Sequence, residues 1–379
     1  MAFPNALRLR RRAAAIHLAS LAASPALLAC GGAAQRASSG GQSVLYVANG
    51  AAGTVTRLDP ASGHPAGALL PTGRAPWLVA PGQGGALLVL SIAPSAADTL
   101  THVLPQGSET RVRSIELAPG QSLVPFSSRI ASDAGRHTLV AYRGRKAVAS
   151  ALALLETASG EIVRTFAVGG PFEEVVDLAL DDGPAGPVAY VGLWTEERWD
   201  DRRRASGRVV AVDARTGTVL AACRTPGVPG QLVLGDGAGV NRRLYVVAGA
   251  PENSDGSTYY GAGLDGGVLD LDALTLAERA VLPMAEPLMC FAVTPGGASA
   301  YAISFTPGKL VRLDLATGSL TDLARLPGPG LGLAISGDRL YVPAPERNEV
   351  WALDRRHGTL LARIPVGAGL ISITGPVGA

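Results

Sequence analysis

Aromatic and charged residues suited to binding a partner gather in the segment 194–207, WTEERWDDRRRASG. The segment holds two tryptophans and three consecutive arginines: Trp194, Trp199, Arg202, Arg203 and Arg204. An exposed indole ring offers a large apolar surface, and a guanidinium group beside it binds acidic groups, so the pattern favours contact with a protein or a glycan. The alternative is a solvated insertion in which the arginines pair with the acidic residues of the same segment.

A second segment, 250–267, has the length and composition of a long loop, APENSDGSTYYGAGLDGG. It carries two tyrosines and an aspartate that could form another wall of a binding surface: Tyr259, Tyr260 and Asp265. Long loops on a rigid scaffold are where binding residues concentrate. The alternative is a loop that packs on itself.

Four further charged residues stand beside short apolar runs that open with Pro or Gly: Arg74, Glu173, Glu174 and Glu286. If their carboxylates cluster, the oxygen atoms suit Ca²⁺ or another hard cation. The same carboxylates could serve acid–base chemistry if their pKa values were raised. The alternative is a set of solvated charges. Apart from such a cation, we expect no cofactor.

Several other chemistries are not indicated by the sequence. Cys-x-x-Cys-His is absent, which excludes covalently attached haem, and no two of the five histidines stand at metal-ligand spacing. No Gly-rich phosphate loop follows a strand and opens a helix, and Gly-x-Ser-x-Gly is missing. The 33 basic residues nearly balance the 31 acidic ones without forming a basic stripe, so nucleic acid is not an expected partner.

The elements that hold these segments are marked by a five-residue pattern, first seen as DPASG at 59–63. It returns as ETASG at 156–160, DARTG at 213–217, DLATG at 314–318 and DRRHG at 354–358, with a degenerate copy, DALTL, at 272–276. The opening carboxylate can accept hydrogen bonds from the backbone N–H groups just ahead of it, and the closing Gly can take a positive φ. Each copy therefore predicts a tight turn between two strands.

A second repeated feature is an apolar strand, often Tyr-Val, that comes before each turn segment. Its Tyr-equivalent positions are 46, 88, 139, 190, 245, 301 and 341. A further short apolar run, such as 75–80 or 230–235, lies ahead of most of these strands. The unit is thus about four strands in roughly 40–56 residues, which are the strand count and period of a propeller blade.

The Tyr-Val-x-Asn strand at 46–49, the Asp-x-x-Ser/Thr-Gly turns and the Pro-x-Gly openings together resemble the YVTN family of β-propeller repeats. The resemblance covers roughly residues 43–379. It implies a propeller of four-stranded antiparallel blades, as found in bacterial and archaeal envelope proteins, often without a known reaction. The second unit departs most, because its turn region, HVLPQGSET at 102–110, lacks the Asp.

Counting the strand-turn-strand units predicts an all-β, seven-bladed β-propeller over 43–379. The first unit has no apolar run of its own ahead of it, whereas an unused run, GLISITG at 369–375, ends the chain. We therefore expect the C-terminal strand to supply the innermost strand of the first blade and to close the ring. In such a ring, segments 194–207 and 250–267 and the charges around Glu173 lie on the face with the tunnel mouth.

The N-terminal residues resemble an export signal of the bacterial lipoprotein type. Arginines at 8–12 precede an apolar run, and LLAC at 27–30 resembles a lipobox. The resemblance implies a signal peptide over 1–29 and a lipid-modified Cys30, followed by a flexible tether over 30–42. The alternative is ordinary cleavage with Cys30 incidental. Cys223 and Cys290 lie in apolar runs, where we expect buried free thiols, with a disulfide as the alternative.

Two functions of different classes fit this organisation. The first is a monomeric binding scaffold in the cell envelope, facing the periplasm or the cell surface, held to the membrane by its lipid anchor alone and binding a protein or glycan. The second is an enzyme, because seven-bladed relatives by resemblance include sugar-lactone hydrolases and quinoprotein dehydrogenase subunits. A cation or cofactor beside Glu173, Glu174 or Glu286 would favour the enzyme, and exposed Trp194 or Trp199 would favour the scaffold.

Overall fold

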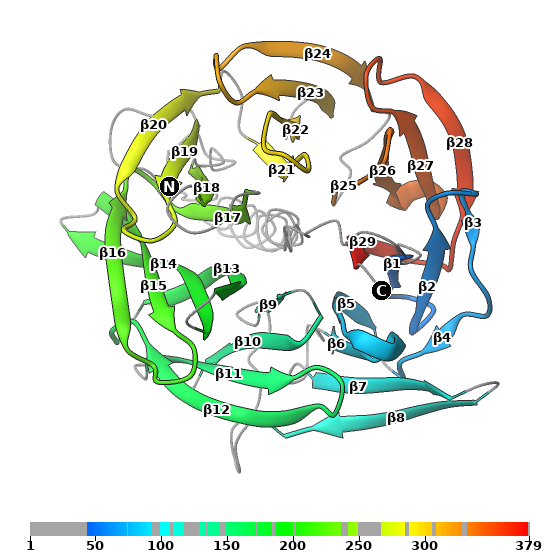
Figure 1. Ribbon diagram of the computed structural model, residues 1–379, viewed down its shortest axis with the longest axis horizontal. Helices are drawn as coiled ribbons and strands as arrows, with labels where there is room; N and C mark the ends of the chain where they lie inside the picture. Colours follow the sequence, from blue (N-terminus) through cyan, green and yellow to red (C-terminus); the bar gives the residue numbers. More distant parts are fainter. Residues whose placement is uncertain are drawn as a thin grey trace, which may run out of the picture.

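The computed structural model describes residues 44–73, 75–91, 99–106, 109–116, 129–133, 135–143, 149–171, 173–183, 186–199, 202–235, 242–248, 267–284, 288–304, 308–326 and 332–377. These residues form seven antiparallel sheets that stand around a ring as seven blades (Figure 1). Helical structure among them comprises two short 3₁₀ turns, η2 (Gln83–Gly85) and η4 (Pro345–Arg347). None of the helices described has the length and apolar character needed to cross a membrane.

Each blade runs from an innermost to an outermost strand. Blade one contains β29 (Leu370–Val377), β1 (Val44–Asn49), β2 (Thr54–Asp59) and two short outer strands, β3 (His64–Pro65) and β4 (Leu70–Pro71). Blade two contains β5 (Pro76–Pro81), β6 (Leu87–Ser91), β7 (Thr99–Gln106) and β8 (Glu109–Ile115). Blade three contains β9 (Arg129–Ser132), β10 (His137–Arg143), β11 (Ser150–Glu156) and β12 (Glu161–Val168).

The remaining blades follow the same order. Blade four contains β13 (Glu174–Gly183), β14 (Gly186–Trp199), β15 (Arg202–Asp213) and β16 (Val219–Thr225). Blade five contains β17 (Pro229–Leu234), β18 (Arg243–Ala248), β19 (Gly267–Asp272) and β20 (Glu278–Pro283). Blade six contains β21 (Leu288–Val293), β22 (Ser299–Ser304), β23 (Lys309–Asp314) and β24 (Leu320–Arg325). Blade seven contains β25 (Ala334–Ser336), β26 (Arg339–Ala344), β27 (Glu349–Asp354) and β28 (Leu360–Pro365).

The repeated five-residue pattern forms the turn between the third and fourth strands, as predicted. In blade six, Asp314 Oδ1 accepts hydrogen bonds from the N–H groups of Ala316 at 3.0 Å and Thr317 at 2.8 Å. Gly318 closes the turn with φ +71°, a conformation that costs glycine little because it has no Cβ. The turns that begin at Asp59, Asp213 and Asp354 are built in the same way.

Two copies of the turn depart from this chemistry. Glu156, one methylene longer than Asp, accepts a hydrogen bond from the hydroxyl of Ser159 at 2.7 Å. In the degenerate copy, Leu276 takes the position of the glycine and adopts φ +56°. Its side chain is buried in the core, so burial of the apolar side chain offsets the cost of the left-handed backbone.

The core lies between the blades. Each apolar cluster among the described residues combines side chains from two neighbouring blades, as where Leu154 of blade three packs with Val191 of blade four. The repeated tyrosines are buried at these boundaries, and the hydroxyl of Tyr341 in blade seven reaches the backbone carbonyl of Pro60 in the first turn at 2.7 Å. Burial between blades means that a single sheet has no complete core of its own.

The C-terminal strand closes the ring, as predicted. β29 pairs antiparallel with β1, with Val47 opposite Ile373, and so becomes the innermost strand of blade one. In Figure 1 the red β29 lies beside the blue β1. Strands from both ends of the described chain therefore share one sheet, which leaves no unpaired edge between them.

The two cysteines of the described residues differ. Cys223 is a free, half-buried thiol, and burial raises its pKa. Cys290 is buried and disulfide-bonded, so the expectation of a free thiol at this position is wrong.

Candidate functional site

Blade four carries a hairpin that extends well beyond the blade core. We expected a loop over 194–207, but β14 and β15 continue as paired strands from Trp194 opposite Gly207 to Trp199 opposite Arg202. The segment lacks the apolar alternation that marks a strand packed on a core, so its sequence pattern did not indicate strands. The two strands are nevertheless paired through their backbones along the whole segment. The Trp- and Arg-rich segment is thus a β-hairpin, and Arg203 and Arg204 lie on its returning strand.

No other described blade has central strands of this length. β14 has 14 residues and β15 has 12, whereas the same strands of blade six have 6 each. In Figure 1 the hairpin formed by these strands projects outward past β16. Because paired strands hold their residues in a fixed register, the hairpin presents its residues on a more rigid support than an irregular loop would.

At the base of the hairpin, Glu173 forms a two-pronged ion pair with Arg208. Arg208 donates from Nε to Oε1 at 2.8 Å and from Nη2 to Oε2 at 2.6 Å. Gly170 N–H adds a third hydrogen bond to Oε2. A carboxylate held by two parallel N–H bonds of one guanidinium is fixed in both position and charge.

This pairing acts against acid–base chemistry at Glu173. The hydrogen bonds from Arg208 hold the pKa of Glu173 below its usual value, although partial burial opposes them, and the Gly170 N–H lowers it further. Acid–base chemistry at this carboxylate would require a raised pKa, and the pKa of Glu173 is lowered instead. Glu173 instead anchors the connection from blade three to Arg208 of β15.

The structure brings some of the predicted site residues together. Glu174, the first residue of β13, lies opposite Trp194 in the strand register, and Arg208 directly follows the hairpin in β15. The indole N–H of Trp194 is buried and has no hydrogen-bond acceptor among the described residues. The other predicted residues lie outside the described residues: Arg74, Glu286, Tyr259, Tyr260, Asp265 and Cys30.

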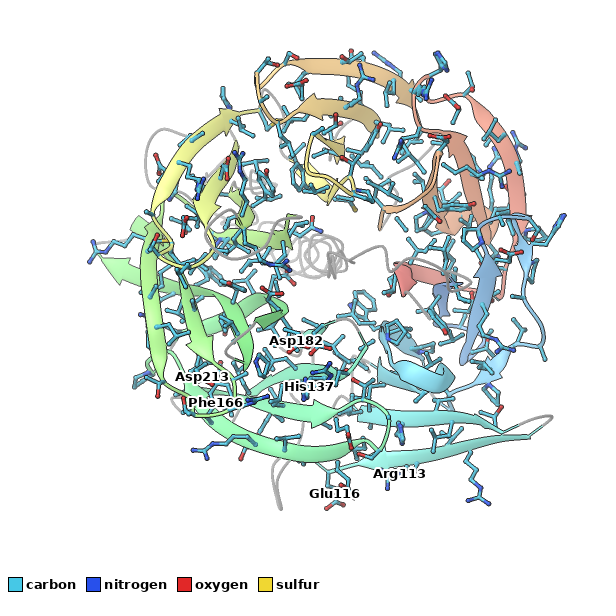
Figure 2. The ribbon with its side chains drawn as sticks, in the orientation of Figure 1. Arg113, Glu116, His137, Phe166, Asp182 and Asp213 are labelled. Carbon is cyan, nitrogen blue, oxygen red and sulfur yellow. The ribbon has the colours of Figure 1, made fainter. Side chains whose placement is uncertain are left out.

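A second group of polar residues, which the sequence reading missed, lies between blades three and four. Asp133, His137 and Asp182 each offer one metal-ligating atom, and these atoms lie within 4.8 Å of one another. Figure 2 shows His137 and Asp182 near each other at this boundary. All three stand at turns between first and second strands, so they lie on the face opposite the blade-four hairpin. The signal in the sequence was Asp133-x-x-x-His137, but its third member is 45 residues further along the chain, where only the fold brings it close.

The comparisons with known proteins agree with the fold and do not define a family. No family model matches the chain, and no curated protein matches it significantly. Among solved structures, apo AztD from Citrobacter koseri is 12% identical with a TM-score of 0.55, covering 89% of this chain and 98% of that one. Dihydro-heme d1 dehydrogenase NirN in complex with DHE is 14% identical with a TM-score of 0.57, covering 89% and 76%.

A third solved structure, a proposed 6-phosphogluconolactonase from Bacteroides fragilis, is 12% identical with a TM-score of 0.56, covering 89% of this chain and 99% of that one. Similarities at this level of identity establish the fold alone. The protein is a seven-bladed β-propeller, and proteins of different activity share that architecture.

Proposed function

We propose that this protein is a lipid-anchored β-propeller of the cell envelope that binds a protein or glycan partner through the blade-four hairpin. The observation that carries the proposal is the hairpin itself, with paired strands that continue through Trp199 and Arg202. Propeller blades of ordinary length need no such extension for their packing. An ordered extension rich in Trp and Arg has the composition of an interaction hot spot.

The chemistry of the hairpin indicates the kind of partner. Its three consecutive arginines can form charge-assisted, two-pronged hydrogen bonds to carboxylate or other acidic groups. This chemistry favours a partner surface with acidic groups, as in an acidic protein face or an acidic glycan.

The assignment to the YVTN type of propeller and to the exported lipoproteins belongs to this proposal. The Tyr-Val strands and Asp-to-Gly turns support the repeat type, and LLAC after an arginine-rich start supports the anchor. The enzymatic alternative has weaker support, because Glu173 is bound by Arg208 and its pKa is lowered. That alternative requires a reacting group elsewhere on the ring.

Crosslinking in cells tests the binding surface. A photoreactive residue at Trp199 should capture a specific partner, whereas the same residue at Arg347, in the corresponding connection of blade seven, should not. With the partner in hand, Trp199→Ala should weaken binding by about 2 kcal/mol or more and leave the melting temperature nearly unchanged. Equal crosslinking at both positions, or unaltered affinity of the Trp199→Ala variant, would move the site away from the hairpin.

The anchor is tested separately. Metabolic labelling with a palmitate analogue should mark the protein, and Cys30→Ser should release it from the membrane fraction. The chain has three cysteines, of which Cys223 is free and Cys290 is disulfide-bonded. A sulfur atom that carries lipid cannot enter a disulfide, so the anchor and a disulfide between Cys30 and Cys290 exclude each other. After reduction, a lipid-modified Cys30 should resist thiol reagents, whereas a Cys30 released from a disulfide would react with them. An unlabelled mature protein that begins at another residue would contradict the lipoprotein assignment.

A further inference from the structure

The boundary of blades three and four holds a cluster of one histidine and two carboxylates on the face opposite the hairpin. Asp133 lies in the connection between β9 and β10, His137 begins β10, and Asp182 lies near the end of β13. The side chain of Asp133 is 1% exposed, that of His137 14% and that of Asp182 23%. The cluster is therefore largely enclosed but reachable from solvent at Asp182.

The two oxygens of Asp133 are used differently. Oδ1 accepts the N–H groups of Arg136 at 2.9 Å and His137 at 2.8 Å, which holds the turn. Oδ2 faces His137 Nδ1 at 2.9 Å. The turn itself needs only one acceptor, because Thr294 holds the matching turn of blade six with a single hydroxyl. The second carboxylate oxygen is thus surplus to the turn and is directed at the imidazole.

Asp182 reaches the cluster from the neighbouring blade. Its Oδ2 lies 3.1 Å from Arg136 Nη1, in a pair whose arginine is 58% exposed. The adjacent Asp181 is paired with Arg242 at 2.7 Å instead. Among the described residues, Asp133 and Asp182 thus bring two carboxylates to the cluster, and carboxylate oxygens suit a cation.

We infer that Asp133, His137 and Asp182 form a binding site for a divalent first-row transition metal, with Zn²⁺ as the best match. Imidazole nitrogen suits this class of ion, and zinc sites with three protein ligands combine histidine with carboxylate and leave a position for water. The three ligating atoms, within 4.8 Å of one another, are close enough to share one ion after small side-chain movements. A purely oxygen-loving ion such as Ca²⁺ would gain less, because only two of the three ligands are carboxylates.

A bound ion would replace two contacts of the cluster. His137 Nδ1 binds the ion through its lone pair, so the ion takes the place of the contact with Asp133 Oδ2. Arg136 must release Asp182, which its exposure allows. The site joins two blades, so a bound ion would tie blade three to blade four, a role separate from partner binding at the hairpin.

Titration of the purified full chain with ZnCl₂, after treatment with a chelator, tests the site by calorimetry. We expect one Zn²⁺ per chain with micromolar or tighter affinity, and an affinity at least tenfold lower in Asp182→Asn and in His137→Gln. Asp338→Asn is the matched control, since Asp338 stands at the corresponding turn of blade seven, paired with Arg355 at 3.2 Å outside the cluster. It should bind as the parent does.

A fourth variant guards against effects on folding. Arg136→Ala keeps all three ligands and removes the competing cation, so it should bind Zn²⁺ several-fold more tightly. Absence of saturable binding in the parent, or equal affinity in Asp182→Asn, His137→Gln and the parent, would overturn the site. Tighter binding of Ca²⁺ than of Zn²⁺ would overturn the class of metal.

Discussion

The side chain of Gln231 in blade five binds both backbone groups of Phe291 in blade six. Oε1 accepts the Phe291 N–H at 2.8 Å, and Nε2 donates to the Phe291 carbonyl at 3.0 Å. Gln231 is buried and follows a bulge in the innermost strand of its blade. Among the described residues, the innermost strand of each blade has no neighbouring strand on its inward side. The side-chain amide of Gln231 supplies the two hydrogen bonds that a neighbouring strand would otherwise give Phe291.

Replacing this amide should destabilise the ring. Gln231→Leu keeps the size of the side chain but leaves two buried backbone groups without partners, which should cost roughly 2–4 kcal/mol. Urea unfolding measures the loss. Thr321→Val, an exposed polar-to-apolar change on β24, is the control and should stay within about 0.5 kcal/mol of the parent. A Gln231→Leu variant as stable as the control would show that the contact contributes nothing.

The same device recurs where the ring closes. Ser372 and Thr374 of β29 donate to the backbone carbonyls of Trp77 and Val79 in blade two. Deleting 368–379 removes these bonds, the pairing with β1 and the buried side chain of Leu370. The truncated chain should lose cooperative thermal unfolding. Circular dichroism measures the thermal unfolding. A sharp transition at the melting temperature of the parent would show that the ring is stable without β29.

His102 should make stability depend on pH. It is buried beside the turn 156–160 of blade three. There its Nε2 lies 3.2 Å from the Thr157 carbonyl oxygen, and its Nδ1 accepts a hydrogen bond from Arg113 Nε at 3.4 Å. Burial, together with the charge of Arg113, lowers the pKa of His102 below its ordinary 6.5. The unfolded chain therefore takes up a proton at higher pH than the folded chain does, so this contribution to stability is full above pH 6.5 and declines as the pH falls below it.

Urea midpoints between pH 7.5 and pH 5.5 measure the effect of His102. His102→Gln should reduce the decline over this range, whereas His64→Gln, at an exposed position, should not. An unchanged decline in His102→Gln would assign the pH dependence to other groups.

Glu173 should also lose its contribution to stability in acid, but at a lower pH than His102 does. Its pKa is lowered in the folded state, chiefly by Arg208. The ion pair therefore stabilises the protein at any pH above the pKa that the carboxyl group has in the unfolded chain. This contribution is lost as the pH falls through the lower pKa of the folded state. Glu173→Gln should cost about 1 kcal/mol at pH 7, since the pair is only partly buried. The difference between variant and parent should shrink toward pH 3 in thermal unfolding. A constant difference at all pH values would indicate a role in packing alone.

The parts of the fold that local chemistry determines were predictable from the sequence. Asp314 and Gly318 specify their turn wherever they occur in this spacing, and alternating apolar residues mark the strands packed between blades. The hairpin beyond Trp194 was not predicted, because its strands pair without an apolar core. A sign was present in the register, where Glu197 lies opposite Arg204, because opposite charges at facing positions favour strand pairing. The cluster of His137 with Asp182 needed the ring itself, since no local pattern links the two.

Ring closure also governs the order in which the protein can assemble. Asn49 pairs with Leu370, and ribosomes add about 5–20 residues per second, so the partners in this sheet are synthesised about 15–60 s apart. The later blades can form in sequence during that interval, whereas the first sheet waits with one edge unpaired. Blade one, although made first, is completed last, and until then its open edge is exposed to chaperones, to proteases and to strands of other nascent chains.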